Sequence, residues 1–397
     1  MGLLPDYIGT GAFGLRLGVI TPGCDLCGMV TDVIERCARD RLLDDGDIVC
    51  VTESVLARTQ GNFVSVEQVS AEVRSKLGAG ECSSIGVVFP ILSRNRFSMI
   101  LEGIAGAVPN GRVVLQLSFP TDEVGNELIP REFVATCTPN SDGVIASREL
   151  QGKTFLHPIT KVDYIRLYRE IIEAAGAVAE IVLCNDPSYL ARRSSAGNGL
   201  TGVIAADIHT REATAAALRD AGARCITLAD LCCEGERSSE WGLLGSNMSS
   251  GRRLKLAPKD AAGFARTVHE SIRAKTGADV EVIVYGDGAY KDPTTGIFEL
   301  ADPMPVFGST EGIVGRMREG VKYKLIADTA IGEGKSAREV EAIIERQKKD
   351  RRAQGHIENE GTTPRRMGDL IASLADLVSG SADAGTPVVL AKGFLSP

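Results

Sequence analysis

Apolar runs that alternate with amphipathic stretches constrain the fold of this chain more than any other feature. The run Ile85 to Pro90 is followed by an amphipathic stretch to about Ala107, and a second apolar run extends from Arg112 to Leu117. The same order returns later, over residues 202–206, 210–221 and 224–228. Strand, helix and strand in succession are typical of a parallel or mixed sheet with covering helices. The sequence therefore predicts an α/β fold with mixed sheets and some α+β character.

Further elements follow from apolar spacing and from residues that stop helices. Residues 47–54 predict a buried strand whose polar end borders a candidate site. Residues 259–275 are spaced as a helix that Gly277 stops before a strand at 280–284. Residues 118–160 carry no long periodic segment, so they predict an ordered excursion or a domain connection. We also expect other elements, a strand at 15–20, a solvated helix at 336–351, a helix at 365–379 and a strand at 387–391.

Length, charge and cysteine usage bound the class of protein. A chain of 397 residues exceeds what one ordinary core fills, so two packed units or one unit with an insertion are expected. The net charge of −8 disfavours nucleic acid or an anionic membrane as the main partner. No window approaches 18 uninterrupted apolar residues, and the first residues lack a signal-peptide pattern. Ten scattered cysteines are typical of reduced, small apolar side chains, so we expect a cytoplasmic protein.

Several familiar motifs are present only as letter patterns. Residues 9–14, Gly-Thr-Gly-Ala-Phe-Gly, match a dinucleotide-binding pattern but lack the preceding strand and following helix. A redox role for this stretch stays an alternative. Gly334-Lys335-Ser336 lacks the remainder of a Walker A sequence. Cys24 and Cys27 form a CxxC with no second pair and no nearby histidine, which favours a turn that leads into a helix over a zinc site.

The strongest chemical signal is the strand-end loop Tyr285-Gly286-Asp287-Gly288, followed by Lys291 and Asp292. Mg²⁺ and Mn²⁺ prefer carboxylate oxygens and usually join one or two carboxylates to substrate phosphates. Asp287 lies between two glycines that let a phosphate approach the backbone. Lys291 would then balance phosphate charge. The alternative is a hairpin rich in turn residues, with no ligand.

Arginine pairs supply a possible anion-binding complement. Arg94 and Arg96 flank an expected helix start, and Arg365 and Arg366 flank another. Backbone N–H groups at a helix start favour anions, and guanidinium groups bind phosphate or carboxylate in a bidentate manner. Two other pairs, Arg192-Arg193 and Arg252-Arg253, lie in expected loops without a helix start, so surface solvation is the favoured interpretation for them.

A series of blocks recurs in the order found in one known family. Residues 22–26 and 45–61, from Pro-Gly-Cys-Asp-Leu to Thr52-Glu53 and Arg58, are followed by the blocks 242–247, 259–260, 276–284 and 368–390. These blocks resemble the coenzyme F420-0:L-glutamate ligase family. Residues 92–98, 285–288 and 361–366 are similar to landmarks of a longer bacterial branch of it.

The resemblance covers about residues 17–105 and 241–395. It implies a ligase-like core formed by residues 1–110 and 241–397, with 111–240 as an inserted or divergent α/β segment.

The resemblance also implies an activity. It implies a ligase that uses GTP or ATP with Mg²⁺ or Mn²⁺ and adds L-glutamate, or a related amino acid, to a carboxylate of an anionic small molecule such as coenzyme F420-0. The expected route is an acyl phosphate that the glutamate amine attacks, in a homodimer. A folate-like acceptor and a regulatory protein that binds nucleotide without turnover are the alternatives. No nucleic acid or membrane partner is expected.

Site residues follow from the residues and the resemblance together. The expected catalytic residues are Asp287, Lys291 and Arg58. The expected metal ligands are Asp287, Glu53 and Asp292. The expected phosphate-binding residues are Thr52, Ser54, Arg94, Arg96, Ser246, Asn247, Gly286, Gly288, Arg365 and Arg366.

Three positions depart from the family's pattern. Leu244 stands where the family usually has an aspartate, and Ser54 and Arg58 stand at a strand end that commonly carries two lysines. Arginine and lysine differ in geometry, so Arg58 does not simply inherit a lysine's role. The same departures are expected of a regulatory protein that binds nucleotide and has lost turnover.

Overall fold

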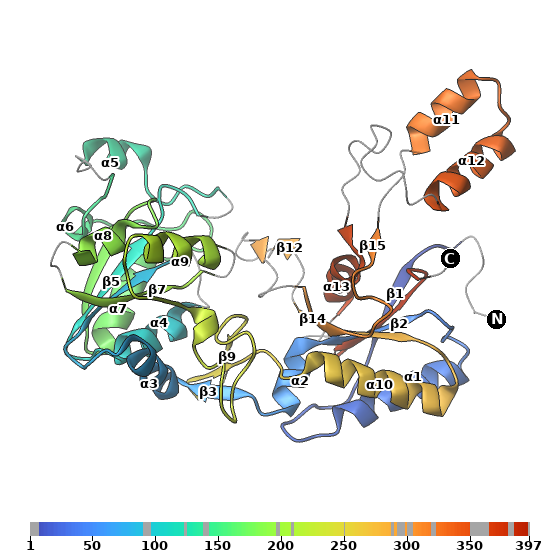
Figure 1. Ribbon diagram of the computed structural model, residues 1–397, viewed down its shortest axis with the longest axis horizontal. Helices are drawn as coiled ribbons and strands as arrows, with labels where there is room; N and C mark the ends of the chain where they lie inside the picture. Colours follow the sequence, from blue (N-terminus) through green and yellow to red (C-terminus); the bar gives the residue numbers. More distant parts are fainter. Residues whose placement is uncertain are drawn as a thin grey trace.

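Two α/β lobes and a helical hairpin make up the chain (Figure 1). The computed structural model describes residues 8–89, 97–122, 125–137, 143–195, 199–207, 210–249, 251–286, 290–291, 298–299, 305–318, 323–349, 365–379 and 385–395. Within those ranges, no helix has the length and apolar character needed to cross a bilayer. The architecture confirms the predicted α/β fold with mixed sheets.

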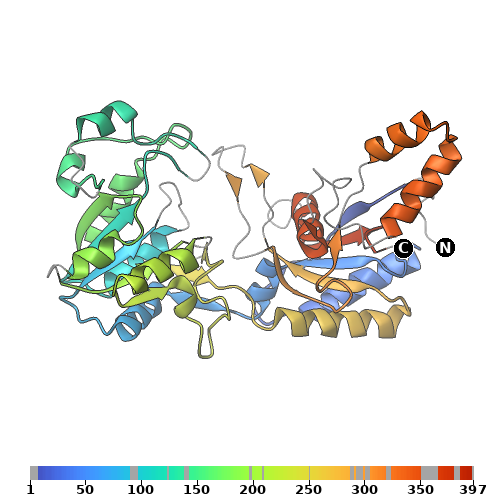
Figure 2. The ribbon, with the colours of Figure 1, turned by 45° about the horizontal axis from the view of Figure 1, so that its top comes forward.

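The first lobe is a five-stranded mixed sheet between two layers of helices. Its strands lie in the order β1 (Gly11–Leu15), β17 (Val388–Lys392), β2 (Ile48–Thr52), β11 (Glu281–Tyr285) and β14 (Val306–Ser309). Only β2 and β11 are parallel; the other neighbouring pairs are antiparallel. Figure 2 shows the two layers, with α1 (Leu26–Arg39) and α10 (Ala261–Thr276) on one face and α13 (Met367–Val378) on the other.

Local signals explain why these elements form where they do. All five residues of β2 are buried, as expected for a strand covered on both faces. The Asp25 side chain accepts a hydrogen bond from the Gly28 N–H at the start of α1, and Asp260 does the same for Gly263 in α10. Gly277, at a φ of 74°, ends α10. The helix predicted over 259–275 and the helix predicted after the CxxC are confirmed.

The second lobe is a five-stranded parallel sheet. Its strands lie in the order β6 (Val178–Leu183), β5 (Arg112–Leu117), β4 (Ser84–Val88), β7 (Leu200–Ala205) and β8 (Cys225–Thr227). The helices α3 (Val66–Leu77), α4 (Phe97–Gly106) and α7 (Tyr164–Ala174) pack on one face. The helices α8 (Tyr189–Ser195) and α9 (Arg211–Asp220) pack on the other.

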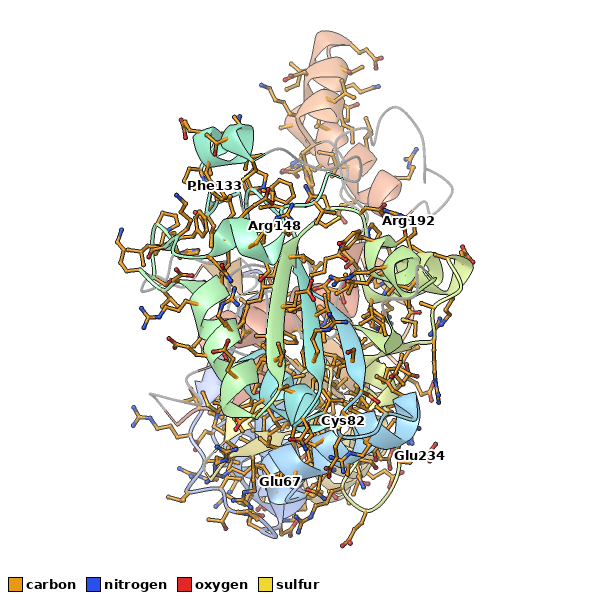
Figure 3. All side chains as sticks on the ribbon, turned by 90° about the vertical axis from the view of Figure 1, so that its left-hand side faces the viewer. Glu67, Cys82, Phe133, Arg148, Arg192 and Glu234 are labelled. Atoms are coloured by element: carbon orange, nitrogen blue, oxygen red, sulfur yellow. The ribbon has the colours of Figure 1, made fainter. Side chains whose placement is uncertain are left out.

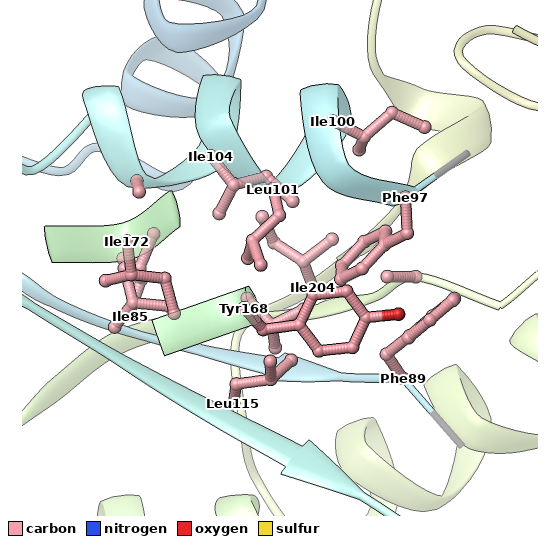
Figure 4. Close-up of a cluster of buried hydrophobic side chains, with 14 of the residues drawn as sticks. Ile85, Phe89, Phe97, Ile100, Leu101, Ile104, Leu115, Tyr168, Ile172 and Ile204 are labelled. Atoms are coloured by element: carbon pink, nitrogen blue, oxygen red, sulfur yellow. The ribbon is translucent and has the colours of Figure 1, made fainter. Parts of the chain in front are cut away.

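An aromatic cluster fills the face that α4 and α7 cover. Phe89 and Phe97 stack with ring centroids 3.9 Å apart, and Tyr168 of α7 meets both rings edge-on. Figure 4 shows these rings beside the aliphatic side chains of α4 and of the sheet. Because Phe89 directly follows β4, this packing fixes where that strand ends.

The sheet of the second lobe crosses the expected boundary at 110/111. β4 and α4 precede that boundary, β5 follows it, and β4 pairs with β5 along its length. Where the structure describes residues 118–160, the helices are short, α5 (Arg131–Thr136) and α6 (Ser147–Leu150), in agreement with the absence of a long periodic segment.

A small sheet lies between the lobes. It consists of β3 (Phe63–Ser65), β10 (Arg253–Lys255) and β9 (Asn247–Ser249), each of three residues, and α2 (Glu53–Thr59) leads into it from β2. Two further antiparallel pairs are β12 (Tyr290–Lys291) with β13 (Phe298–Glu299), and β15 (Met317–Arg318) with β16 (Arg365–Arg366). The hairpin of α11 (Tyr323–Gly332) and α12 (Ala337–Lys349) has its own small core.

The glycine pattern near the start of the chain forms an edge strand. Gly11 and Gly14 belong to β1, which pairs antiparallel with β17. The strand expected at 15–20 is therefore wrong, since regular structure ends at Leu15. A dinucleotide loop would need a following helix, which this stretch does not provide.

All ten cysteines are free thiols. Burial raises the pKa of Cys232 to about 12 and raises the pKa of Cys50 as well. Their thiols therefore stay protonated at neutral pH and act as small apolar side chains.

Candidate functional site

The carboxyl ends of β2 and β11 bring the two expected site segments to one edge of a sheet. Thr52 and Tyr285 are Cα partners in the parallel register. Glu53 and Gly286, which follow them, therefore lie at the same edge, and both are buried. The N–H of Gly286 donates to the carbonyl oxygen of Pro305 at 2.8 Å, which fixes the start of the loop. Open α/β sheets bind ligands at such an edge.

A buried ion pair stands at this edge. Lys255 Nζ, from β10, donates to both carboxylate oxygens of Glu53 at 2.7 and 2.9 Å. The Lys255 side chain is 10% exposed and that of Glu53 is 9% exposed. A charge in such surroundings needs its partner, so each residue fixes the position of the other. Lys255 was not among the expected site residues.

One face of the small sheet continues from this ion pair. Lys255 stands opposite Phe63 and Asn247, and Arg253 stands opposite Ser249. Directly opposed side chains share a face of a sheet, and residues two apart along a strand share it too. We call the set Phe63, Ser65, Asn247, Ser249, Arg253 and Lys255 the polar face of the small sheet. Leu254 belongs to the opposite face, where it joins the core of the second lobe.

An arginine-lined pocket opens beside this polar face. It has a volume of about 270 Å³, and its lining includes Arg58, Arg237, Arg253 and Ser249. The Nε of Arg58 donates to the Ile20 carbonyl at 2.9 Å, which anchors its guanidinium group. The Arg253 guanidinium lies 5.2 Å from the centroid of the Phe63 ring.

Three guanidinium groups around one pocket form a binding site suited to anions. Arg253 belongs to β10 and not to a loop, so that part of its expectation is wrong, but its side chain is exposed as expected while it lines the pocket. Its neighbour Arg252 is exposed and forms an ion pair with Glu102.

The Ser-Asn pair that the resemblance singled out reaches the same region. Asn247 begins β9, and Ser246 before it is 4% exposed. Within the described parts of the chain, the Ser246 hydroxyl oxygen has no hydrogen-bond partner. A buried hydroxyl group without a partner is costly, so Ser246 stands out among the residues of this region.

Leu244 lies inside the core of the second lobe. It is 1% exposed and packs among apolar side chains that include Leu243. The position where the family usually carries an aspartate is therefore apolar and inaccessible in this chain, and Leu244 supplies no ligand to the polar face of the small sheet.

The other expected site residues fall into two groups. Ser54 is half-buried on α2, and Arg366 is exposed on β16, in a separate two-stranded pair. The backbones of Lys291 and Arg365 belong to β12 and β16, and their side chains lie outside the described residues. A second group lies wholly outside them: Asp287, Gly288, Asp292, Arg94 and Arg96. Across the ranges that the structure describes, no cluster of three or more histidine, cysteine, aspartate or glutamate residues is arranged to hold a metal ion.

Comparison with known proteins decides the family. A family model described as F420-0:Gamma-glutamyl ligase matches residues 14–393. The chain belongs to the F420-0:gamma-glutamyl ligase family. The match spans both lobes, including residues 111–240, which the resemblance of separate blocks had left outside. No curated protein matches the chain.

The family is one of ligases that form γ-glutamyl bonds. The arginine pocket and the strand edge of β2 and β11 both lie within the matched residues.

Proposed function

We propose that this chain is an amide ligase that adds L-glutamate, or a related amino acid, to a carboxylate of an anionic small molecule such as coenzyme F420-0. Membership of the F420-0:gamma-glutamyl ligase family is the observation that carries this proposal. The arginine pocket supports it, because a polyanionic acceptor and a nucleotide both need cationic partners. A folate-like acceptor has the same requirement and is the alternative substrate.

The proposed route has two steps. A carboxylate oxygen of the acceptor attacks the γ-phosphorus of GTP or ATP, and the nucleoside diphosphate leaves. The α-amine of glutamate then attacks the acyl carbon, inorganic phosphate leaves, and the amine loses its proton. Both steps need stabilisation of phosphate charge more than acid or base catalysis.

Each residue near the strand edge has one role in the proposed reaction. Arg58, Arg237 and Arg253 bind the anionic groups of the acceptor or nucleotide. The Ser246 hydroxyl donates to a phosphate oxygen. Lys255 keeps Glu53 in position.

The carboxylate oxygens at the carboxyl ends of β2 and β11 are the type of donor that a hard divalent cation binds. Glu53 supplies carboxylate oxygens, the donor type that a hard divalent cation prefers, and Lys255 holds this carboxylate in place. Asp287, one residue beyond the fixed Gly286, and Asp292 are the proposed companions. Mg²⁺ or Mn²⁺ held there would neutralise charge on the β- and γ-phosphates. Lys291, Arg94, Arg96, Arg365 and Arg366 stay sequence-based proposals for phosphate binding.

A turnover assay tests the proposal directly. The purified protein is incubated with GTP or ATP, Mg²⁺ or Mn²⁺, L-glutamate and a panel of carboxylate acceptors, with F420-0 first and folates next. We expect phosphate release that depends on the acceptor, together with an amide product identified by mass. Light scattering of the same sample tests the proposed homodimer. Nucleotide binding without product under every combination would contradict the ligase and favour the regulatory protein, which the apolar burial of Leu244 also favours.

Two adjacent arginines provide a matched test of the arginine pocket. We expect Arg253→Gln to raise the KM for the anionic acceptor or the nucleotide roughly 10- to 100-fold, the effect of losing one hydrogen bond to a charged group. Arg252→Gln removes the same charge one residue away, where the side chain binds Glu102, so its KM values should stay within about twofold of wild type. Equal effects of the two substitutions would mean that only net charge matters.

A further inference from the structure

One buried asparagine lies where the three segments that carry the pocket arginines meet. Arg58 belongs to α2, Arg237 to the loop 231–238, and Arg253 to β10. Asn62 stands between α2 and β3 and is only 2% exposed. Its hydrogen bonds reach each of the three segments, so they bear on how the three guanidinium groups are placed.

The loop that carries Arg237 comes from the second lobe. Figure 3 shows Glu234 of this loop at the same end of the lobe as Cys82, whereas Arg192 lies at the opposite end. Cys82 lies just before β4, so this is the end at which the parallel strands begin. The loop contains no helix or strand, so contacts with other segments decide where Arg237 lies.

The side chain of Asn62 joins this loop to the end of β10. Its Nδ2 donates to the carbonyl oxygens of Ser238 at 2.8 Å and Ala257 at 2.9 Å. Ser238 directly follows Arg237, and Ala257 lies two residues beyond Lys255, the last residue of β10. Two carbonyl partners fix the orientation of the amide, because only its NH₂ group donates. The amide therefore holds the loop against the strand.

The backbone of Asn62 adds the third segment. Its N–H donates to the carbonyl oxygen of Ala57 at 3.1 Å, next to Arg58 in α2. Its carbonyl oxygen accepts from the Leu256 N–H at 3.0 Å, which continues the pairing of β3 with β10. One residue therefore connects all three segments that carry the pocket arginines.

Gln60 makes a similar connection at the surface. Its amide exchanges two hydrogen bonds of 2.8 Å with the backbone of Lys259. Gln60 is exposed, so water can replace these bonds at little cost. The bonds of Asn62 are buried, so their loss costs more, because water does not readily replace the donor that two buried carbonyl oxygens would lose.

We propose that Asn62 is a positioning residue, which sets the separation of the three pocket arginines. An anion that several guanidinium groups bind must lie within hydrogen-bond distance of all of them at once, and a shift of about 1 Å in one segment breaks that geometry. Asn62 does not line the pocket, so it acts through the arginines. The inference rests on the proposed binding role of the pocket, and its readout is anion binding instead of turnover.

Calorimetric titration of the full-length protein with inorganic pyrophosphate tests this role. We expect the wild type to bind pyrophosphate and Arg253→Gln to bind it about tenfold more weakly or worse, which locates the probe in the pocket. Asn62→Leu has a side chain of similar volume without a donor, and it should also weaken binding about tenfold or more. If circular dichroism shows that Asn62→Leu does not fold, Asn62→Ala takes its place, because the smaller side chain lets water reach the two carbonyl oxygens.

Thr310 provides a matched control for the loss of a buried hydrogen bond. Its hydroxyl oxygen accepts from the Val282 N–H at 2.9 Å, and the residue is buried. Val282 lies near the start of β11, whereas Gly286 follows the end of that strand. Thr310→Val keeps the shape of the side chain and removes this bond. It should lower stability and leave the affinity for pyrophosphate within about twofold of wild type.

A double substitution separates positioning from a general loosening of the fold. Asn62→Leu combined with Arg253→Gln should weaken pyrophosphate binding by less than the product of the two single effects, because one of the arginines to be positioned is gone. Failure of the wild type to bind pyrophosphate, equal affinities of Asn62→Leu and Thr310→Val, or multiplicative effects in the double variant would overturn the proposal. The expected binding pattern in a protein without ligase turnover would support Asn62 and contradict the proposed function alone.

Discussion

Lys255→Met is expected to lower the free energy of unfolding by about 3–5 kcal/mol, because it removes the cation that donates to both oxygens of the buried Glu53 carboxylate. The methionine side chain has a similar volume, so the cost comes from the lost ion pair. Glu53→Met should cost a similar amount for the reciprocal reason. Urea unfolding followed by circular dichroism measures both.

The double substitution separates stability from function. Removing both charges together is often neutral or stabilising, so Glu53→Met combined with Lys255→Met should recover most of the lost stability. Turnover should not recover with it, because the proposed site would have lost a metal ligand and the lysine that positions it. We expect a folded protein whose turnover is lower by about 10²-fold or more.

The opposite end of the same strand supplies a matched control. Asp47 precedes β2 and forms a buried ion pair with Lys392. The side chain of Lys392 is 7% exposed and that of Asp47 is 5% exposed. Replacing both of these residues by methionine removes an equally buried pair far along β2 from the Glu53 end. Its turnover should match that of the wild type. If both double variants keep full turnover, the Glu53–Lys255 pair is purely structural.

The sequence predicted the elements that long apolar runs define. β2, β11 and α10 lie within two residues of their expected bounds, because a run of four or five buried residues or a capped helical period marks each of them. The expected βαβ unit over 85–117 is also present. The domain boundary at 110 divided that unit, because it followed the similarity of separate blocks and not the strand pairing.

The polar face of the small sheet was not predictable in the same way. Three strands of three residues are too short to show a period, and their pairing joins residues such as Phe63 and Lys255. Glu53 and Lys255 are separated by 202 positions, so no local pattern connects them. The alternation Arg253-Leu254-Lys255-Leu256 was a signal that could have identified a half-buried strand, since Leu254 and Leu256 are fully buried.

The candidate site residues were expected at strand ends, and the structure brings some of these strand ends together. Glu53, Gly286 and Asn247 were expected from the strand ends and the resemblance, and the structure brings the first two to one edge and the third to the adjoining polar face. Lys255, Arg237 and Arg253 were missed because charged residues in short segments have the same local pattern as solvated loops.

Asp287→Asn is expected to reduce metal-dependent turnover by about 10²-fold or more while leaving the free energy of unfolding unchanged. The loop that carries Asp287 begins at Gly286, whose position is fixed by β11 and by its hydrogen bond to Pro305. The substitution keeps the shape of the side chain and removes its charge. A hard cation prefers carboxylate oxygen to amide oxygen, so the variant should also need more Mn²⁺ to reach half of its maximal rate.

Asp279 provides the control for this substitution. It stands at the other end of β11, and its side chain is 66% exposed with only long contacts to His269 and Arg273. Asp279→Asn removes the same charge from the same strand and should leave both turnover and the Mn²⁺ dependence at wild-type values. An Asp287→Asn protein with normal turnover at every Mn²⁺ concentration would exclude Asp287 as a ligand. Glu53 would then be the only proposed carboxylate whose place at this edge the structure describes, and the cation would have to be held chiefly by the phosphates of the nucleotide.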